Sequence, residues 1–240
     1  MNKGTNHLLE AIAKLFSTFP KGRVLDLGAG SGMFSNRLQQ MGFDVVAVDL
    51  RPEHFDFKSS VSFQACDITN PLPFGENSFE YILLTEVIEH LKNPSGALIQ
   101  INRLLKRGGF LVLSTPNILS LKSRFRFLRE GNFEYFREPP LDQAASFGVK
   151  AGDIHRVAWR YHELEFLLVE SGFHVFRILT SVCEGYGLCG LLPLVFFQTW
   201  FKQRRSLRKR GLDYRRIHRI ILSKELLWGR HLIVCCRRKS

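Results

Sequence analysis

Two carboxylates and an imidazole lie close together in the sequence, at Glu86, Glu89 and His90. Their spacing of i, i+3 and i+4 predicts that the three side chains project from one side of a helical turn. Such a set could hold a divalent cation, with His155 as a fourth ligand, or His90 alone could act as a general base. In a third interpretation the residues have only a structural role: the two glutamates stabilise the N-terminus of a helix through its dipole, and His90 is packed beside them. We predict Glu89 and His90 as catalytic residues, and Glu86, Glu89, His90 and His155 as a metal site.

A second candidate site is the glycine-rich stretch over residues 23–32, Arg-Val-Leu-Asp-Leu-Gly-Ala-Gly-Ser-Gly. Its apolar start predicts a buried strand. Gly28, Gly30 and Gly32 allow a tight turn close to a ligand, and a helix is expected to follow. A strand, a glycine turn and a helix form the first unit of a nucleotide-binding α/β sheet. The next strand ends at Asp49, whose carboxylate could accept both hydroxyl hydrogen bonds of a ribose.

The spacing of these glycines indicates which cofactor they suit. It is G-x-G-x-G, whereas the dinucleotide fingerprint is G-x-G-x-x-G, and Met33 stands where a glycine would be expected. Asp26, just before the turn, would repel a pyrophosphate but would suit a cationic ligand. S-adenosylmethionine carries a sulfonium, an ammonium group and a ribose, so the spacing and Asp26 together favour it over a dinucleotide.

The segment Val-Leu-Asp-Leu-Gly-Ala-Gly-Ser-Gly resembles the first motif of the class I S-adenosylmethionine-dependent methyltransferases. The resemblance implies cofactor contacts from Asp26, Gly28, Gly30, Gly32, Asp49, Leu50, Asp67, Ile68 and Thr85. Within this set it places Asp67 near the adenine amino group. A turn aspartate that caps the next segment is an alternative interpretation of Asp67.

The pattern Glu-x-x-Glu-His-Leu at residues 86–91 resembles two groups of methyltransferases. These are the ubiquinone-biosynthesis O-methyltransferases and the small-RNA 3′-terminal 2′-O-methyltransferases. In the second group such residues hold a metal together with a later histidine, which His155, followed by Trp159, loosely matches. No Asn-Pro-Pro-Tyr, Asp-Pro-Pro-Tyr or Pro-Cys follows the expected fourth strand, so methylation of DNA amines or of cytosine C5 lacks support. An oxygen atom on a small, lipid-like or sugar acceptor is the remaining expectation.

The elements that must position these residues alternate between helix and strand along the chain. Strands are expected at 24–27, 44–49, 61–65, 77–84, 110–114, 172–180 and 231–236, and helices at 7–16, 31–41, 95–105 and 161–171. This order predicts one Rossmann-like α/β domain over residues 1–240. The resemblance to class I methyltransferases implies a seven-stranded, mostly parallel sheet with helices on both faces and an antiparallel last strand. Residues 118–160, rich in Arg, Phe and Pro, are expected to cover the substrate.

The net charge of +12 belongs to the second half of the chain. Residues 1–120 hold 11 basic and 11 acidic residues, whereas residues 121–240 hold 23 basic and 11 acidic residues. This excess of positive charge predicts an anionic partner.

Five cysteines without C-x-x-C spacing predict free thiols in a reducing compartment. The N-terminus leads into an amphipathic helix rather than a signal peptide.

A long insertion is expected at residues 181–230, before the last strand. Residues 188–197 carry no polar side chain, and residues 202–219 hold nine Lys or Arg against one acid, Asp213. An apolar wedge beside a basic cluster favours an anionic membrane surface. A buried helix with a solvated basic face, and RNA binding, are the alternatives.

The sequence therefore predicts a cytoplasmic methyltransferase that associates peripherally with the inner face of a membrane. Its acceptor would be a lipid-linked, isoprenoid or glycan-biosynthetic intermediate that is methylated on oxygen. RNA ribose 2′-O-methylation is the alternative reaction. A non-catalytic, methyltransferase-like membrane scaffold is the alternative without chemistry.

Overall fold

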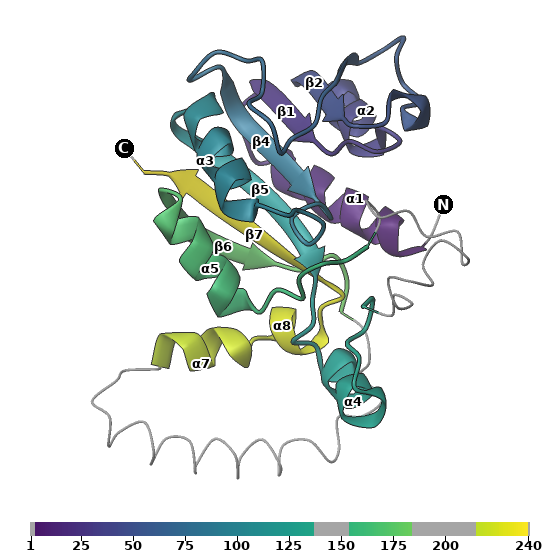
Figure 1. Ribbon diagram of the computed structural model, residues 1–240, viewed down its shortest axis with the longest axis vertical. Helices are drawn as coiled ribbons and strands as arrows, with labels where there is room; N and C mark the ends of the chain where they lie inside the picture. The colour runs from purple at the N-terminus through teal and green to yellow at the C-terminus, as the bar shows by residue number, and fades with distance from the viewer. Residues whose placement is uncertain (1–2, 137–153, 184–214, 240) are drawn as a thin grey trace.

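Residues 3–136, 154–183 and 215–239 are described in the computed structural model (Figure 1). The elements in chain order are α1 (Lys3–Phe16), β1 (Arg23–Leu27), α2 (Met33–Gln40), β2 (Asp44–Asp49), η1 (Pro52–His54), β3 (Ser62–Ala65), β4 (Phe79–Thr85), α3 (Pro94–Leu104), β5 (Leu105–Pro116), α4 (Leu121–Glu130), α5 (Tyr161–Glu170), β6 (Phe173–Leu179), α7 (Arg215–Ile221), α8 (Lys224–Trp228) and β7 (His231–Arg238). The apolar run 188–197 and residues 202–214 of the basic cluster lie outside the described residues.

The seven strands form one sheet in the order β3-β2-β1-β4-β5-β7-β6. The first five strands in this order pair in parallel, and β7 runs antiparallel to both β5 and β6. The predicted Rossmann-like sheet with an antiparallel last strand is therefore confirmed. The strand order reverses between β1 and β4, so the carboxyl ends of these two strands flank the crevice in which open α/β sheets bind ligands.

Helices cover both faces of the sheet (Figure 1), as expected. The alternation along β4 shows how the sequence builds the two layers. Tyr81 and Leu83 pack with apolar residues of α1 and α2, while Ile82 and Leu84 pack with those of α3, α5 and α8. Because successive side chains of a strand point to opposite faces, a strand that is covered on both sides reads as a continuous apolar run.

Strand β5 begins earlier than predicted. The Lys-Arg-Gly-Gly sequence at 106–109 was expected to close the preceding helix, but the chain enters the sheet directly after α3 at Leu105. Leu105 is fully buried and pairs with Phe79, and the β4–β5 register shifts between Phe79 and Tyr81. Burial of Leu105 and its pairing with β4 therefore outweigh the local preference of two glycines for a turn.

The last part of the 181–230 insertion belongs to the domain core. Leu226 of α8 is fully buried against the face of the sheet that α3 and α5 cover. The side-chain amide of Asn117, just after β5, donates to the carbonyl oxygens of Leu226 and Gly229 at 3.0 and 2.8 Å. Burial of Leu226 and these hydrogen bonds therefore hold α8 in place, and the membrane-facing insertion over 181–230 stays a prediction.

Candidate active site

The glycine turn after β1 is fastened to β2. The backbone amides of Gly28 and Ala29 both donate to the Val48 carbonyl oxygen, at 2.8 and 3.0 Å. A Cβ atom on Gly28 would lie 2.4 Å from the Val87 side chain, so this glycine is required for close packing against the segment after β4. Gly30 is different, because a Cβ atom there would meet nothing within 4 Å. The bare backbone of Gly30 therefore leaves open space in which a ligand can approach the turn.

Asp49 is held in a defined orientation at the carboxyl end of β2. One carboxylate oxygen accepts a hydrogen bond from the Gly30 amide at 2.8 Å, and the other accepts one from the Arg51 amide at 2.9 Å. A carboxylate has about four acceptor positions, so each oxygen retains capacity for a ligand hydroxyl. The geometry thus agrees with the predicted contact between Asp49 and a diol.

Asp26 lies beneath the glycine turn rather than in a cavity wall. Its side chain is fully buried, and Ser35 of α2 donates a hydrogen bond to it at 2.5 Å. Burial raises the pKa of Asp26 to about 6, although the Ser35 hydrogen bond opposes this. Asp26 therefore ties β1 to α2, and an effect on a bound cation would act through the turn above it.

The other residues expected near a nucleoside follow β2 and β3. Leu50 is 65% exposed, and Ile68 is half-buried against the core. Asp67 accepts hydrogen bonds from the amide and hydroxyl of Thr69, at 2.9 and 2.7 Å, and these bonds lower its pKa. This is the turn geometry of the alternative interpretation of Asp67, and it leaves the contacts of Leu50, Asp67 and Ile68 with a cofactor as predictions.

A cavity of about 370 Å³ opens where β1 and β4 end. Its wall includes the glycine turn, Thr85 and Glu86 after β4, and His155. Arg230 and His231, at the start of β7, also line it. The cavity therefore joins the predicted cofactor turn to a polar, ionisable wall.

Residues 86–90 form a turn and not a helix, so the prediction of three side chains on one helical face is wrong. Glu86 has a φ of 53°, in the left-handed region. Its carboxylate accepts a hydrogen bond from the Ser114 hydroxyl at 2.7 Å and lies 3.9 Å from the His231 ring. Its position deep in the cavity wall raises the pKa of Glu86 to about 7. Glu86 consequently faces β5 and β7.

Glu89, His90 and His155 come together, as the metal hypothesis requires. One potential ligand atom from each residue lies within 4.8 Å of the others, and the two imidazole rings are 4.7 Å apart. The backbone fixes this meeting, because the Glu89 carbonyl accepts from the Arg156 amide at 2.7 Å. His90 Nδ1 donates to the Ile154 carbonyl at 3.1 Å, which places the lone pair of the neutral ring on Nε2. Glu86 is not part of this cluster.

The Glu89 carboxyl group is fully buried, which is uncommon for an acidic side chain. Among the described residues neither carboxylate oxygen has a well-aligned hydrogen-bond partner, although the Thr115 side chain lies near enough to oppose the rise in its pKa. Burial, together with the nearby charge of Glu86, raises the pKa of Glu89 well above its ordinary value. A buried carboxyl group without well-aligned partners destabilises a fold, so a cation beside His90 and His155 would satisfy it.

Comparison with known proteins decides the family. A family model described as a methyltransferase domain matches residues 2–175. The chain belongs to this methyltransferase family. Together with the sheet order and the glycine turn, this makes it a class I S-adenosylmethionine-dependent methyltransferase, and an enzyme rather than an inert scaffold.

The curated relatives match only part of the chain. A ubiquinone biosynthesis O-methyltransferase of Xanthomonas oryzae is 32% identical over 103 residues, which is 40% of this chain and 43% of the relative. An uncharacterized methyltransferase of Mycobacterium bovis is 37% identical over 94 residues, 38% of each chain. The matched region thus spans about two fifths of the length of these relatives, and their substrates do not follow from the match.

Solved structures are similar over nearly the whole chain. A S-adenosylmethionine-dependent methyltransferase from Archaeoglobus fulgidus has a TM-score of 0.59 at 16% identity, with 96% of this chain and 94% of that chain covered. One from Mesorhizobium loti has a TM-score of 0.55 at 16% identity, with 96% and 100% covered. These similarities support the fold.

The site suits S-adenosylmethionine. The open space above Gly30 admits a ligand to the backbone of the turn, and Asp49 presents oriented acceptors for ribose hydroxyls. Glu86 supplies a carboxyl group in the same cavity for a cationic ligand. When bound, the cofactor supplies an electrophilic methyl group, while the chain supplies orientation and a route for the acceptor proton.

The sequence analysis did not predict several residues of the cavity wall, among them an arginine, a histidine and a tyrosine. Tyr135, Arg230 and His231 line the cavity, and the Arg230 guanidinium lies 5.1 Å from the centre of the Tyr135 ring. His231 opens the last expected strand, and its antiparallel pairing with Pro116 carries it to the carboxyl end of β5. The polar start of an otherwise apolar last strand is the signal that could have indicated it.

Replacing Asp49 with Ala is expected to weaken S-adenosylmethionine binding by about 1–3 kcal/mol, because the ribose would lose a charged acceptor. Isothermal titration calorimetry measures the change. Asp44→Ala is the matched control, since Asp44 lies at the opposite end of β2 and pairs with Arg23 on the surface at 3.4 Å. Equal affinities for the wild type and Asp49→Ala would remove Asp49 from the site.

Proposed function

We propose that this methyltransferase transfers a methyl group to an oxygen atom of a lipid-linked acceptor, such as an isoprenoid intermediate, at an anionic membrane surface. The observation that carries the proposal is the exposed apolar and basic face of α4, whose following segment reaches the cavity at Tyr135. The names of the ubiquinone biosynthesis relatives, which describe O-methylation, agree with it.

Helix α4 exposes large apolar side chains next to basic ones. Phe125 is 44% exposed and Leu128 is 84% exposed, and their i, i+3 spacing places them on one face. Arg129 is 73% exposed, and Lys122 is 54% exposed. An amphipathic helix with this composition lies in the interface of an anionic membrane, where apolar groups insert and cations meet lipid headgroups.

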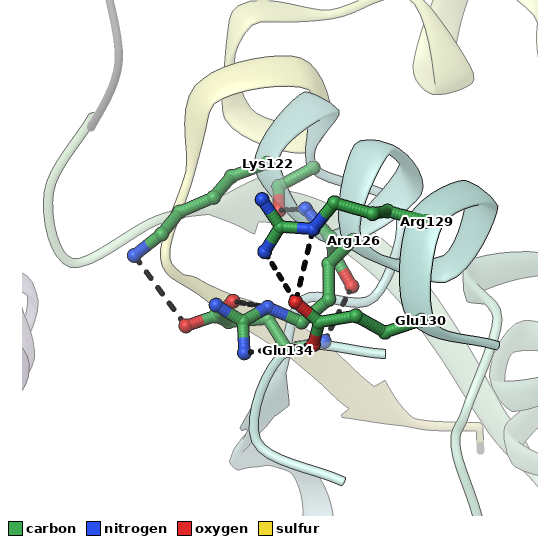
Figure 2. Close-up of polar contacts among 7 residues, drawn as sticks. Lys122, Arg126, Arg129, Glu130 and Glu134 are labelled. Carbon is green, nitrogen blue, oxygen red and sulfur yellow. Dashed lines mark hydrogen bonds and ion pairs between the residues drawn. The ribbon is translucent and has the colours of Figure 1, made fainter. Parts of the chain in front are cut away.

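Ion pairs connect α4 to the segment that follows it, as Figure 2 shows. Arg126 pairs with Glu134 at 2.5 Å and with Glu130 at 3.6 Å, and Lys122 pairs with Glu134 at 3.5 Å. These contacts neutralise both acids of the segment. They also fix the chain that leads from α4 to Tyr135, which lines the cavity. A lipid-linked acceptor held at α4 would therefore lie close to the cavity entrance.

A divalent cation at Glu89, His90 and His155 is part of the proposal. One carboxylate and two imidazoles form a ligand set that is typical of first-row transition metals. The buried carboxylate of Glu89 and the tautomer imposed on His90 both suit such an ion. It would supply a positive charge at the side of the cavity that His155 lines.

RNA ribose 2′-O-methylation is the second candidate. It draws support from the meeting of His155 with Glu89 and His90, because the resemblance associates that arrangement with small-RNA methyltransferases. The basic half of the chain also suits phosphates.

No helix in the described ranges has the length and apolar character needed to cross a bilayer.

The test is methyl transfer from labelled S-adenosylmethionine to two acceptor pools, a total lipid extract and a small-RNA fraction. We expect label in the lipid pool, its loss with a chelator, and its recovery with a divalent ion. Label confined to RNA would replace the lipid proposal with the second candidate. Full activity in chelator would remove the metal.

The double substitution Phe125→Asp and Leu128→Asp is expected to weaken binding to anionic vesicles by about 3 kcal/mol, roughly 100-fold, because two apolar side chains no longer insert. Vesicle co-sedimentation measures this at several salt concentrations. Phe166→Asp is the matched control, since Phe166 is 64% exposed on α5. Unchanged binding of the double variant would exclude α4 from the membrane contact.

A further inference from the structure

A chain of polar side chains runs along the cavity wall on the side of β7. The Ser181 hydroxyl lies 2.6 Å from Nδ1 of His231. On the other side of the ring, Nε2 of His231 lies 3.9 Å from a carboxylate oxygen of Glu86. The second oxygen of Glu86 accepts the hydrogen bond from Ser114. Ser181 after β6, Glu86 after β4 and Ser114 within β5 are thus linked to the first residue of β7.

The distance between His231 and Glu86 has a chemical meaning. At 3.9 Å the two groups are too far apart for a direct hydrogen bond. An oxygen atom placed between them would be within hydrogen-bonding distance of both, since such contacts span about 2.7–2.9 Å. Both residues line the cavity that the glycine turn also lines. A hydroxyl bound there would therefore face the cofactor side of the cavity.

We propose that the acceptor hydroxyl donates a hydrogen bond to Nε2 of His231, in the space between this nitrogen and the carboxyl group of Glu86, and that His231 removes its proton. This inference rests on the proposed methylation of oxygen. It gives Glu86 the role of stabilising the protonated base instead of binding a metal, and it makes His231, rather than His90, the general base.

The proposed role requires the tautomer in which Nδ1–H of His231 donates to the Ser181 oxygen, 2.6 Å away. When Nδ1–H donates to the Ser181 oxygen, the lone pair of the neutral ring lies on Nε2, toward Glu86. The acceptor oxygen forms a bond to the methyl carbon as the carbon–sulfur bond breaks and its electron pair passes to sulfur. The hydroxyl proton passes to Nε2. The products are a methyl ether, a neutral thioether and an imidazolium that the Glu86 carboxylate stabilises.

The other histidines are less suited to this step. His90 is outside the described cavity lining, and its Nδ1 is held by Ile154. His155 lines the cavity, but it belongs to the cluster with Glu89 and packs 5.0 Å from the Phe136 ring. The Arg230 guanidinium, also in the cavity wall, favours the ionised form of Glu86.

The experiment compares His231→Asn with the wild type. The asparagine amide can replace Nδ1 in the contact with Ser181 but offers no base at the position of Nε2. The probe is a short-chain prenylated catechol in detergent micelles, with labelled S-adenosylmethionine. We expect the saturating rate to fall by about 100-fold or more, while KM and cofactor affinity stay within about threefold of the wild-type values. His174→Asn, an exposed histidine on β6, should behave as the wild type.

A second variant separates chemistry from folding. His231→Ala should recover part of its rate when imidazole is added, which a purely structural histidine would not do. A His231→Asn enzyme that keeps more than a third of the wild-type rate would overturn the inference. So would a loss of rate matched by an equal loss of cofactor affinity, without imidazole rescue. A wild-type enzyme that methylates neither the probe nor a lipid extract would instead refute the proposed function itself.

Discussion

Replacing Glu89 with Gln is expected to stabilise the fold at pH 8 while abolishing methyl transfer. The carboxyl group is buried without a well-aligned hydrogen-bond partner among the described residues, and its pKa is raised by burial. A raised pKa means that its contribution to stability is complete below the ordinary glutamate pKa and is lost as the pH rises toward the folded value. Gln carries no charge, so the variant should be about 1–3 kcal/mol more stable at pH 8 and similar to the wild type at pH 4.

Thermal melts from pH 4 to pH 8 measure this difference, and Glu53→Gln, on the surface, is the control. Addition of a divalent cation should raise the melting temperature of the wild type and leave that of Glu89→Gln unchanged. Turnover should fall by about 100-fold or more in Glu89→Gln and in His90→Ala, while both retain cofactor affinity. A wild type that no divalent cation stabilises would contradict the metal site, and a fully active Glu89→Gln would contradict any role for this side chain.

Replacing Gly28 with Ala should destabilise the protein by about 2–5 kcal/mol, which combines a left-handed backbone with overpacking. Gly28 has a φ of 77°, and its new methyl group would meet the Val87 side chain at 2.4 Å. Gly131→Ala is the matched control, because Gly131 has a φ of 71° but nothing within 4 Å of the added Cβ atom. It should therefore show the backbone cost alone.

A double-mutant cycle separates the two costs at the turn. Adding Val87→Ala to Gly28→Ala should restore the part that comes from overpacking, and the coupling energy measures that part. Urea denaturation of the four proteins supplies the free energies of unfolding. If Gly28→Ala were no more destabilising than Gly131→Ala, the close packing of Val87 on the glycine turn would not constrain this position.

Local sequence patterns predicted most of the sheet because its central strands are strongly apolar. Strand β2 has the predicted bounds, since a buried run is flanked by Asp44 and Asp49. Strand β5 was predicted too short, because the glycines at 108 and 109 are locally typical of a turn. Pairing of Leu105 with Phe79 draws that segment into the sheet, and no window of a few residues contains this information.

In the site, too, contacts between residues distant in sequence decide the local structure. Spacing alone favoured a helix for residues 86–90, but Glu86 is bound to Ser114 of β5. The Glu86 amide donates to the Ser114 carbonyl oxygen, and the Ser114 hydroxyl donates to the Glu86 carboxylate. These contacts, 28 residues apart, accompany the left-handed backbone of Glu86. The approach of His155 to Glu89 was part of the predicted metal site, although no local pattern links these two residues. His231 was missed because its role depends on the antiparallel register of β7.

The position of β7 between β5 and β6 has a consequence for synthesis on the ribosome. Among the described strands, β6 pairs with β7 alone, and residues 180–230 separate the two strands in the sequence. At translation rates of about 5–20 residues per second, β6 is complete roughly 3–12 s before β7 is. During that interval the edge of β5 that will later pair with β7 presents unpaired backbone N–H and C=O groups. These groups can pair with another nascent chain. Ribosomes paused within this connection should therefore yield aggregation-prone chains that recruit chaperones.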